Sequence, residues 1–417
     1  MTDHAFPKIC VIGLGYVGLP TAAVFASRGI EVLGVDTNAR TVALINDGRV
    51  PIVEPDLDIL VKGAVAAGKL SASTSPDTAD AFIIAVPTPF TEGKKPDLSY
   101  VKAAVESLAP VLKSGDLVII ESTCPVGTTD SASQWLAEAR PDLRFPHSAG
   151  SDTDIHVAHS PERVLPGRVL IELVCNDRVV GGVGPDCARR AAQLYRIAIE
   201  GECLLTTART AELVKLSENA YRDVNIAFAN ELSLVADKLG IDAWEAVRLA
   251  NHHPRVNILN PGPGVGGHCI AVDPWFIVDS APELTPLIRT ARQVNDGKPA
   301  HIANTVRAAA AAMQTRRIAC LGLAYKADID DLRESPSVDV VADLAKPGDL
   351  ALAVVEPHCQ QLPNDLQGLK GVELIDLATA LEAADIIVLL TDHRPFGDID
   401  PADYPDKRFI DTRGLWK

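Results

Sequence analysis

The strongest constraint on the fold is a glycine-rich stretch, GLGYVG, at residues 13–18. It follows a short apolar run at residues 8–12, which predicts a β-strand, and it precedes a helical pattern that continues to Ala26. A second expected strand, residues 31–36, ends in the acidic residue Asp36. A GxGxxG pattern alone is weak evidence. In this setting, however, it predicts the first βαβ unit of a doubly wound α/β sheet.

Each glycine of this turn has its own physical task. Gly13 makes the tight turn, Gly15 lets the backbone approach a pyrophosphate, and Gly18 allows close packing of helix on strand. The N-terminus of the following helix adds positive potential for the phosphates. Asp36 can accept hydrogen bonds from a ribose 2′-hydroxyl and would repel a 2′-phosphate, so the sequence predicts NAD rather than NADP as cofactor.

Composition limits the class of protein and its partners. The chain has 417 residues, 47% hydrophobic and 23% charged, which suits two or three globular domains. Its longest apolar runs, such as residues 386–390, are far shorter than a membrane span, and its N-terminus lacks a targeting pattern. We therefore expect a cytoplasmic protein without a membrane partner. A net charge of −16 argues against nucleic acid, because binding a phosphate backbone needs a basic face.

The eight cysteines are scattered singly, without CxxC or Cys/His metal-ligand spacing. This pattern is typical of reduced thiols and predicts neither a disulfide framework nor a metal site. Adjacent histidines at positions 252 and 253 resemble a metal pair only superficially, since neighbouring side chains rarely share one ion.

Two further strands, expected at residues 81–86 and 116–120, each end in a polar loop that contains proline. Ligands of a doubly wound sheet lie beyond the carboxyl ends of its strands, so Thr88, Thr123 and Thr129 are candidates for lining a cofactor cleft. Each threonine is equally well explained as a turn residue or a helix cap. A later proline-marked loop places Glu162 beside Arg163; as most glutamates are solvated, Glu162 is by itself only a modest candidate base.

A long helix is expected from residue 210 to residue 239, where Gly240 ends it. Lys215, Asn219 and Arg222 share one face of this helix. They offer three hydrogen-bond donors where a solvated helix would usually show carboxylate partners, which suits an oxyanion or a phosphate. A second helix, residues 243–250, leads to a loop that contains Arg255.

Four glycines and two prolines crowd residues 261–267, just before Cys269 and close to Asp273. Such backbone can adopt positive φ and can approach a ligand that a Cβ would push away. Most cysteines outside disulfides are small buried hydrophobes, but a structural cysteine has no need of a glycine cluster. We therefore interpret Cys269 as a reactive thiol at the rim of an open turn.

After a helix expected at residues 299–313, the α/β pattern resumes, with strands at residues 317–323, 351–355, 385–390 and 408–411. This predicts a second Rossmann-like unit. Its first turn lacks GxGxxG, so we expect a ligand other than a dinucleotide. Lys326 and Arg333 precede Ser335 and Pro336, which predict the N-cap and first position of a helix. These basic residues could bind a diphosphate. If they are isolated charges on the surface, they have no functional significance.

Seven motifs together resemble the UDP-glucose/GDP-mannose dehydrogenase family over essentially the whole chain. They are GxGxxG with Asp36, Pro87-Thr88-Pro89, Ser122-Thr123 with Pro125-Val126-Gly127, Ser160-Pro161-Glu162, Lys215 with Asn219, Gly266-Gly267-His268-Cys269 with Asp273, and Asp331-Leu332-Arg333-Glu334-Ser335. Within the family, residues 254–276 are most similar to members that oxidise UDP-N-acetyl-D-mannosamine. The resemblance implies two Rossmann-like domains, an NAD-binding one at 1–205 and a UDP-sugar-binding one at 301–417, joined by a helical, dimerising and catalytic domain at 206–300.

The resemblance also implies the chemistry, a four-electron oxidation of a sugar C6 hydroxyl to a carboxylate by two NAD-dependent hydride transfers. A thiolate that adds to the intermediate aldehyde gives a thiohemiacetal, whose carbon can donate the second hydride and become a thioester that water hydrolyses. By the family pattern, Cys269 is the nucleophile, and Lys215 and Asn219 stabilise charge on the C6 oxygen. Lys215 also donates or accepts a proton, and Asp273 orients water or holds the lysine. Glu162 with Thr123 serves thioester hydrolysis.

The remaining assignments also follow from the resemblance alone. Contacts with the nucleotide-sugar substrate are implied for Arg163, Val164, Lys215, Asn219, Arg222, His253, Arg255, Gly266, Tyr325 and Lys326. Contacts with NAD are implied for Gly13, Gly15, Tyr16, Val17, Gly18, Asp36, Thr88, Thr129 and Arg333. A homodimer through the long helix is expected. Cys124 departs from the small residue usual in its loop, and a second thiol there could make the cleft sensitive to oxidation.

Three alternatives remain open at this point. One is the same chemistry on another sugar, as in UDP-glucose or GDP-mannose dehydrogenases, because pocket shape sets the sugar. The second is a scaffold that binds NAD without catalysis, although such a protein needs none of Cys269, Lys215, Asn219 and Asp273. The third is a one-step hydroxyacid dehydrogenase, which would need neither the thiol nor a third domain.

Overall fold

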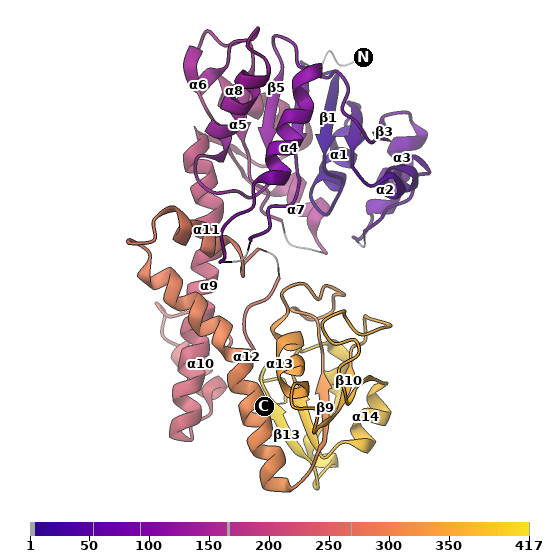
Figure 1. The fold of residues 1–417 in the computed structure, drawn as a ribbon, viewed down its shortest axis with the longest axis vertical. Coiled ribbons are helices and arrows are strands. Elements are labelled where there is room, and N and C mark those ends of the chain that lie inside the picture. Colours follow the sequence, from indigo (N-terminus) through magenta and orange to yellow (C-terminus); the bar gives the residue numbers. More distant parts are fainter. Residues whose placement is uncertain (1–4, 53, 92, 165–166, 268, 417) are drawn as a thin grey trace. The chain divides into compact units, whose positions relative to one another are not determined.

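The computed structural model describes residues 5–52, 54–91, 93–164, 167–267 and 269–416; His268, part of the cysteine motif, lies outside the described residues (Figure 1). Contacts divide the chain into two units, Met1–Glu218 with Trp275–Ser280, and Asn219–Pro274 with Ala281–Lys417. The boundary falls inside α9 (Ala208–Leu239), so one continuous helix contributes residues to both units. The three-domain division of the sequence stays a prediction. Among the described residues, no helix combines the length and the apolar character needed to cross a lipid bilayer.

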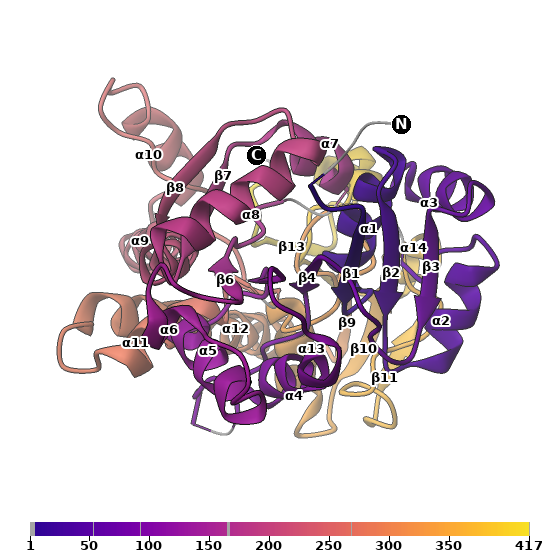
Figure 2. The same ribbon diagram turned by 90° about the horizontal axis from the view of Figure 1, so that it is seen from above.

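The described residues of the first unit form an eight-stranded sheet with the order β3-β2-β1-β4-β5-β6-β7-β8. The strands are β1 (Lys8–Ile12), β2 (Glu31–Val35), β3 (Leu70–Ser73), β4 (Ala81–Ile84), β5 (Leu117–Ile120), β6 (His156–His159), β7 (Arg178–Gly182) and β8 (Cys203–Thr207). Neighbours are parallel except for the antiparallel pair β6 and β7. The strand order reverses between β1 and β4, which is the switch point where such a sheet leaves a ligand crevice (Figure 2).

Helices cover both faces of this sheet (Figure 2). One face packs against α1 (Gly18–Ser27), α3 (Leu57–Ala66), α7 (Val169–Cys175) and α8 (Pro185–Ala198), and the other against α4 (Ser99–Leu108) and α5 (Thr128–Ala139). The short 3₁₀ helix η1 (Ala109–Val111) follows α4. Two further helices pack at the periphery, α2 (Ala39–Asn46) on β3 and α6 (Pro146–Ala149) on α5. Because β1, β4 and β5 are buried on both faces, their sequences are almost continuously apolar, which is why the sequence reveals them.

The described residues of the second unit contain a five-stranded parallel sheet with the order β11-β10-β9-β12-β13. The strands are β9 (Arg317–Leu321), β10 (Ala351–Val355), β11 (Val372–Leu374), β12 (Ile386–Leu389) and β13 (Arg408–Asp411). One face packs against α12 (Pro286–Met313) and α13 (Pro336–Ala345), and the other against α14 (Leu377–Ala383) and the turn η2 (Arg394–Asp398). The remaining elements are α10 (Ala243–Ala250), α11 (Asp273–Ser280), which crosses the boundary between the units, and η3 (Pro401–Asp403).

The predicted fold class is confirmed, since two doubly wound α/β sheets accompany a long central helix. The helix expected at residues 299–313 is wrong at its start, because α12 begins at Pro286 and continues through Pro299. A proline inside a helix removes one hydrogen bond and normally ends or kinks it. Here buried polar contacts hold the first half in place. Arg292 and Asn295 both bond the carboxylate of Asp223, and Lys298 bonds the hydroxyl of Ser233.

Candidate active site

The glycine turn after β1 has the geometry that its sequence predicts. Gly13 has φ 91° and donates its N–H to the carbonyl oxygen of Val35 at 2.8 Å. A Cβ on Gly13 would lie 2.5 Å from the carbonyl oxygen of Ala85, and one on Gly18 would lie 1.8 Å from that of Gly13. Around Gly15, by contrast, no described atom lies within 4 Å of a Cβ position. Gly13 and Gly18 therefore serve packing, and Gly15 keeps open the space that a pyrophosphate needs.

Two further features of this turn fit a dinucleotide. In the described structure, α1 has neither a side-chain cap nor an acidic residue in its first turn, so its first N–H groups can receive a phosphate. Asp36 follows β2 directly, and its carboxylate accepts the N–H groups of Leu14 at 3.1 Å and Asn38 at 2.8 Å. These bonds fix the half-buried carboxylate beside the turn, as ribose binding requires. Tyr16 and Val17 are half-buried in the same turn.

The three predicted threonines lie at the same edge of the sheet but have different surroundings. Thr88 donates its hydroxyl to the carbonyl oxygen of Thr123 at 2.6 Å, which links the loops after β4 and β5. Thr129 is fully buried, and its N–H and hydroxyl bond one carboxylate oxygen of Glu212 at 2.8 and 2.6 Å. The other oxygen of Glu212 accepts the N–H of Gly127 at 2.6 Å. A residue of α9 thus caps α5, a role that no local pattern indicates.

Cys124 is buried within this group. Its sulfur lies 3.9 Å from Glu212 Oε1 and 4.0 Å from His159 Nδ1. Burial lowers the pKa of His159 to about 3, so its imidazole is neutral. Oxidation of a thiol requires access and thiolate character, and a side chain that is 1% exposed lacks the access. The oxidation sensitivity suggested for this position therefore has no support in the structure.

Glu162 follows β6 and is 8% exposed, not solvated. It forms an ion pair with Arg178, whose guanidinium also binds Glu121 Oε1 at 2.7 Å. Tyr195 donates its hydroxyl to the same oxygen at 2.7 Å. Burial raises the pKa of Glu121, although Arg178 opposes this. No local pattern in the sequence indicates Arg178 and Glu121, because their contact depends on the antiparallel pairing of β7 with β6.

The other predicted residues of the first unit flank this ion-pair group. Arg163 donates its backbone N–H to Glu162 at 2.7 Å, and its guanidinium bonds Glu218 at 2.7 Å. Val164 packs against the core of the unit. Lys215 is half-buried in the part of α9 that belongs to this unit.

In the second unit, Cys269 is half-buried and begins the turn that leads into α11. Its carbonyl oxygen accepts the N–H of Asp273 at 2.8 Å. The carboxylate of Asp273, 2% exposed, accepts a hydrogen bond from Asn219 Nδ2 at 2.5 Å. The structure thus joins three predicted catalytic residues, from α9, the cysteine loop and the start of α11. Because the Asn219 amide is bonded on one side, its orientation is fixed.

The glycines before Cys269 make close contacts with another segment of the chain. A Cβ on Gly266 would lie 2.5 Å from the carbonyl oxygen of Glu334 and 2.6 Å from Cβ of Tyr325, and one on Gly267 would lie 3.0 Å from the Tyr325 ring. Gly267 also donates its N–H to the carbonyl oxygen of Arg333 at 3.1 Å. The glycines therefore allow a neighbouring segment of the chain to approach closely, and the contact of Gly266 with a substrate stays a prediction.

The basic residues of the second unit differ in their surroundings. Arg333 forms a two-bond ion pair with Asp331, at 2.9 and 2.7 Å, and Lys326 is half-buried in the same segment. Ser335 occupies the N-cap position of α13, but its hydroxyl donates to the carbonyl oxygen of Leu323 at 2.6 Å and does not cap the helix. Three predicted substrate contacts lie on the surface, namely Arg222 on α9 and His253 and Arg255 after α10.

Comparison with known proteins agrees with this arrangement. Family models of the UDP-glucose/GDP-mannose dehydrogenase family match the chain as its NAD binding domain over residues 7–199, its central domain over 209–297 and its UDP binding domain over 319–417. The chain is 58% identical over 414 residues to NDP-N-acetyl-D-galactosaminuronic acid dehydrogenase of Ralstonia nicotianae, covering 99% of this chain and 97% of that one. It is also 58% identical over 421 residues to UDP-N-acetyl-D-mannosamine dehydrogenase of Yersinia pestis, covering 99% and 100%.

A solved structure extends the likeness to three dimensions. The UDP-D-ManNAc dehydrogenase of Pyrococcus horikoshii matches with a TM-score of 0.88 and 40% identity, covering 98% of this chain and 96% of that one. The predictions of the family and of NAD as cofactor are confirmed. The chain belongs to the UDP-glucose/GDP-mannose dehydrogenase family and is an NAD-dependent nucleotide-sugar dehydrogenase.

Proposed function

We propose that the chain oxidises UDP-N-acetyl-D-mannosamine at C6 to UDP-N-acetyl-D-mannosaminuronate in two NAD-dependent steps. The observation that carries this proposal is the joining of Cys269, Asp273 and Asn219 at the start of α11. An enzyme that stops at the aldehyde needs no nucleophilic thiol, whereas a four-electron oxidation needs a group that retains the aldehyde between the two steps.

The chain's own residues supply the covalent part of this chemistry, while bound NAD supplies the hydride acceptor for each step. The Cys269 thiolate forms a C–S bond to the aldehyde carbon, and the resulting oxyanion takes a proton to give a thiohemiacetal. Loss of the second hydride and of the hydroxyl proton converts this group to a thioester. Water then adds to the thioester, the C–S bond breaks, and the thiolate leaves with the acid released.

Neighbouring side chains stabilise the oxygen charge that develops in these steps. We assign this role to Lys215 and to the Asn219 amide, which Asp273 holds in one orientation, because a fixed donor costs no reorganisation during reaction. We assign thioester hydrolysis to Glu162 with Thr123. The ion pair with Arg178 holds the Glu162 carboxylate in one orientation, as a residue that positions water requires.

A second sugar is a specific alternative, because two relatives with equal identity have different names. One name specifies N-acetyl-D-mannosamine and the other N-acetyl-D-galactosaminuronic acid, and both sugars carry an acetamido group. The test is an assay of NADH formation with UDP-N-acetylmannosamine, UDP-N-acetylgalactosamine, UDP-glucose and GDP-mannose. We expect two NADH per sugar and a preference for UDP-N-acetylmannosamine. One NADH per sugar, or release of free aldehyde by the native enzyme, would contradict the proposal.

The Cys269→Ser variant tests the nucleophile. We expect acid formation to fall by at least about a thousandfold, because an alcohol is not ionised near neutral pH and cannot replace a thiolate. NAD affinity, measured by calorimetry, should change by less than about twofold, since the dinucleotide turn belongs to the other unit. Cys359→Ser, which alters another half-buried cysteine, is the matched control and should keep full turnover. Normal acid formation by Cys269→Ser would remove the proposed nucleophile.

We also infer a homodimer through α9. Tyr221, Phe228 and Val235 are spaced by seven residues, so they share one face of the helix, and their exposed fractions are 70%, 57% and 48%. A second copy of this chain can cover such a stripe by antiparallel packing of the same helix.

All eight cysteines are described and none forms a disulfide, which supports a reducing compartment such as the cytoplasm.

A further inference from the structure

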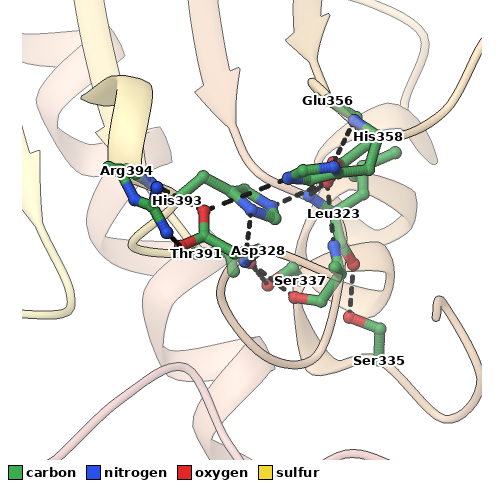
Figure 3. A network of polar contacts seen from close by, with 10 residues as sticks. Leu323, Asp328, Ser335, Ser337, Glu356, His358, Thr391, His393 and Arg394 are labelled. Atoms are coloured by element: carbon green, nitrogen blue, oxygen red, sulfur yellow. Dashed lines mark hydrogen bonds and ion pairs between the residues drawn. The ribbon is translucent and has the colours of Figure 1, made fainter. Parts of the chain in front are cut away.

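The second unit contains a polar network centred on two buried residues, Glu356 and His393 (Figure 3). Glu356 directly follows β10 and is 5% exposed, while His393 follows β12 and is fully buried. Both lie at the carboxyl edge of the sheet, on either side of the loop that follows β9. They are therefore at the switch point of the second sheet, where a ligand of a doubly wound fold binds.

Glu356 corresponds in position to Asp36 of the first unit, and both carboxylates accept the N–H of the residue after the glycine and the N–H two residues further along the chain. In both units the glycine after the first strand donates its N–H to the end of the second strand at 2.8 Å, Gly13 to Val35 and Gly322 to Val355. Glu356 Oε2 accepts the N–H groups of Leu323 at 2.7 Å and Ala324 at 3.0 Å, and Nε2–H of His393 at 3.1 Å; Oε1 accepts the N–H of His358 at 3.0 Å. Compared with Asp36, Glu356 thus holds two further groups of the chain, the N–H of Ala324 and the ring of His393.

The hydrogen bonds of His393 define its tautomer. Its Nδ1 accepts the N–H of Asp328 at 2.9 Å, so the ring proton lies on Nε2 and is donated to Glu356. Asp328 has φ 59°, a left-handed conformation that is costly for a residue with a Cβ and that persists only where its surroundings fix it. The Asp328 carboxylate in turn accepts the N–H of Arg394 at 3.0 Å. Both ring nitrogens of His393 are therefore engaged in holding the chain.

These bonds fix the segment 323–335, which contains Tyr325, Lys326 and Arg333. On its other side, the hydroxyl groups of Ser335 and Thr391 bond the carbonyl oxygens of Leu323 and Ala324, each at 2.6 Å. The Tyr325 ring lies against the position of Gly267, two residues before Cys269. A continuous path of contacts thus runs from Glu356 and His393 through the segment to the cysteine loop, entirely within the second unit.

We propose that Glu356 and His393 are positioning residues, which hold segment 323–335 in the shape that binds the uridine nucleotide and supports the Cys269 loop. This inference rests on the proposed function, and both residues act through the segment without taking part in the reaction. The ionised state of Glu356 is consistent with it. Burial would raise the pKa of Glu356, but the hydrogen bonds from His393 and from the backbone of Leu323 hold that pKa below its ordinary value.

Substitutions at His393 can separate its two hydrogen bonds. The side-chain oxygen of His393→Asn occupies a position near that of Nδ1 and can accept from Asp328, whereas His393→Ala removes both bonds. Glu356→Gln removes the charge and places an amide group among four donors. Glu373→Gln is the matched control, because it makes the same substitution as Glu356→Gln at an exposed residue of β11.

The readouts are calorimetric Kd values for UDP and for NAD, and kcat and KM for UDP-N-acetylmannosamine, all in the full-length enzyme. We expect Glu356→Gln and His393→Ala to weaken UDP binding by about tenfold or more, with a lower kcat, and His393→Asn to recover part of both. NAD affinity in these variants, and all readouts in the Glu373→Gln control, should stay within about twofold of wild type. Loss of a residue that serves only overall stability would not weaken UDP binding while leaving NAD binding unchanged.

Three outcomes would overturn the inference. They are unchanged UDP affinity and KM in Glu356→Gln and His393→Ala, equal losses of UDP and NAD binding, and no recovery in His393→Asn relative to His393→Ala. A failure of the proposed function is distinguishable, because the wild-type enzyme itself would then form one NADH per sugar, release free aldehyde or prefer another nucleotide sugar.

Discussion

Arg178 carries a buried charge that is shared by two carboxylates of the first unit. Its side chain is 5% exposed and stands between Glu121 and Glu162, and its guanidinium lies over the Tyr195 ring at 4.3 Å. A buried ion pair adds little to stability compared with apolar residues of similar size. Removal of one partner is costly, however, because the remaining charge then has no compensation.

The Arg178→Met variant should therefore lose about 3–5 kcal/mol of unfolding free energy, because two buried carboxylates lose their shared cation. Urea denaturation measures this change. The control is Arg209→Met, which removes an ion pair with Asp130 whose arginine side chain is 68% exposed. Such a surface pair contributes at most about 1 kcal/mol. Equal losses in the two variants would show that Arg178 has no special role.

At the scale of elements, the cysteine loop and segment 323–335 are two irregular segments that depend on each other. At three glycines of the loop, an added Cβ would lie very close to another atom of the chain. The distance from the Cβ position to the nearest such atom is 2.8 Å for Gly264, 2.5 Å for Gly266 and 3.0 Å for Gly267. Two residues of the segment, Asp328 and Glu334, have left-handed φ values of 59° and 49°. The cysteine loop thus approaches the chain closely because it lacks side chains at these positions, while segment 323–335 contains strained backbone.

The Gly266→Ala variant should lower kcat/KM by about a hundredfold or more, because displacement of a catalytic group by about 1 Å can have that effect. The added methyl group would meet the carbonyl oxygen of Glu334, which cannot move aside as a flexible side chain would. Gly297→Ala is the control, since no described atom lies within 4 Å of its Cβ position in α12. It should keep activity and gain up to about 1 kcal/mol of stability from helix propensity. Wild-type kinetics in Gly266→Ala would contradict the close contact.

The sequence predicts those elements whose cause is local. The turn at Gly13 to Gly18, the buried strands and the helix at residues 243–250 follow from glycine spacing, apolar runs and helix ends, and the structure confirms them. The start of α12 and the capping of α5 by Glu212 were missed, because each depends on side chains far away in the sequence. The same limit applies to Arg178 and His393. The residues that surround them can be identified only when the pairing of strands from distant parts of the sequence is known.

For the whole molecule, the exposed stripe of Tyr221, Phe228 and Val235 bears on assembly. A chain with a net charge of −16 repels its own copies at long range, so association requires a contact surface that is apolar and locally uncharged. The stripe offers such a surface along α9.

The Phe228→Glu variant should shift the protein from dimer to monomer, because it places a carboxylate near its own copy in an antiparallel contact. Analytical ultracentrifugation at micromolar concentration measures the shift. Ile59→Glu is the control, since Ile59 is 69% exposed on α3 and lies outside the stripe, and it should leave the assembly unchanged. A Phe228→Glu protein that sediments like the wild type would mean that copies associate through another surface or not at all.

The contact of Tyr325 with Gly266 and Gly267 has a consequence for how this enzyme can evolve. The phenol ring occupies the volume that a side chain at position 267 would fill, whereas a side chain at position 266 would meet Cβ of Tyr325 and the carbonyl oxygen of Glu334. A descendant that gains a side chain at position 267 must therefore shrink the aromatic group at 325, and we expect position 266 to stay glycine because the obstructing oxygen belongs to the backbone.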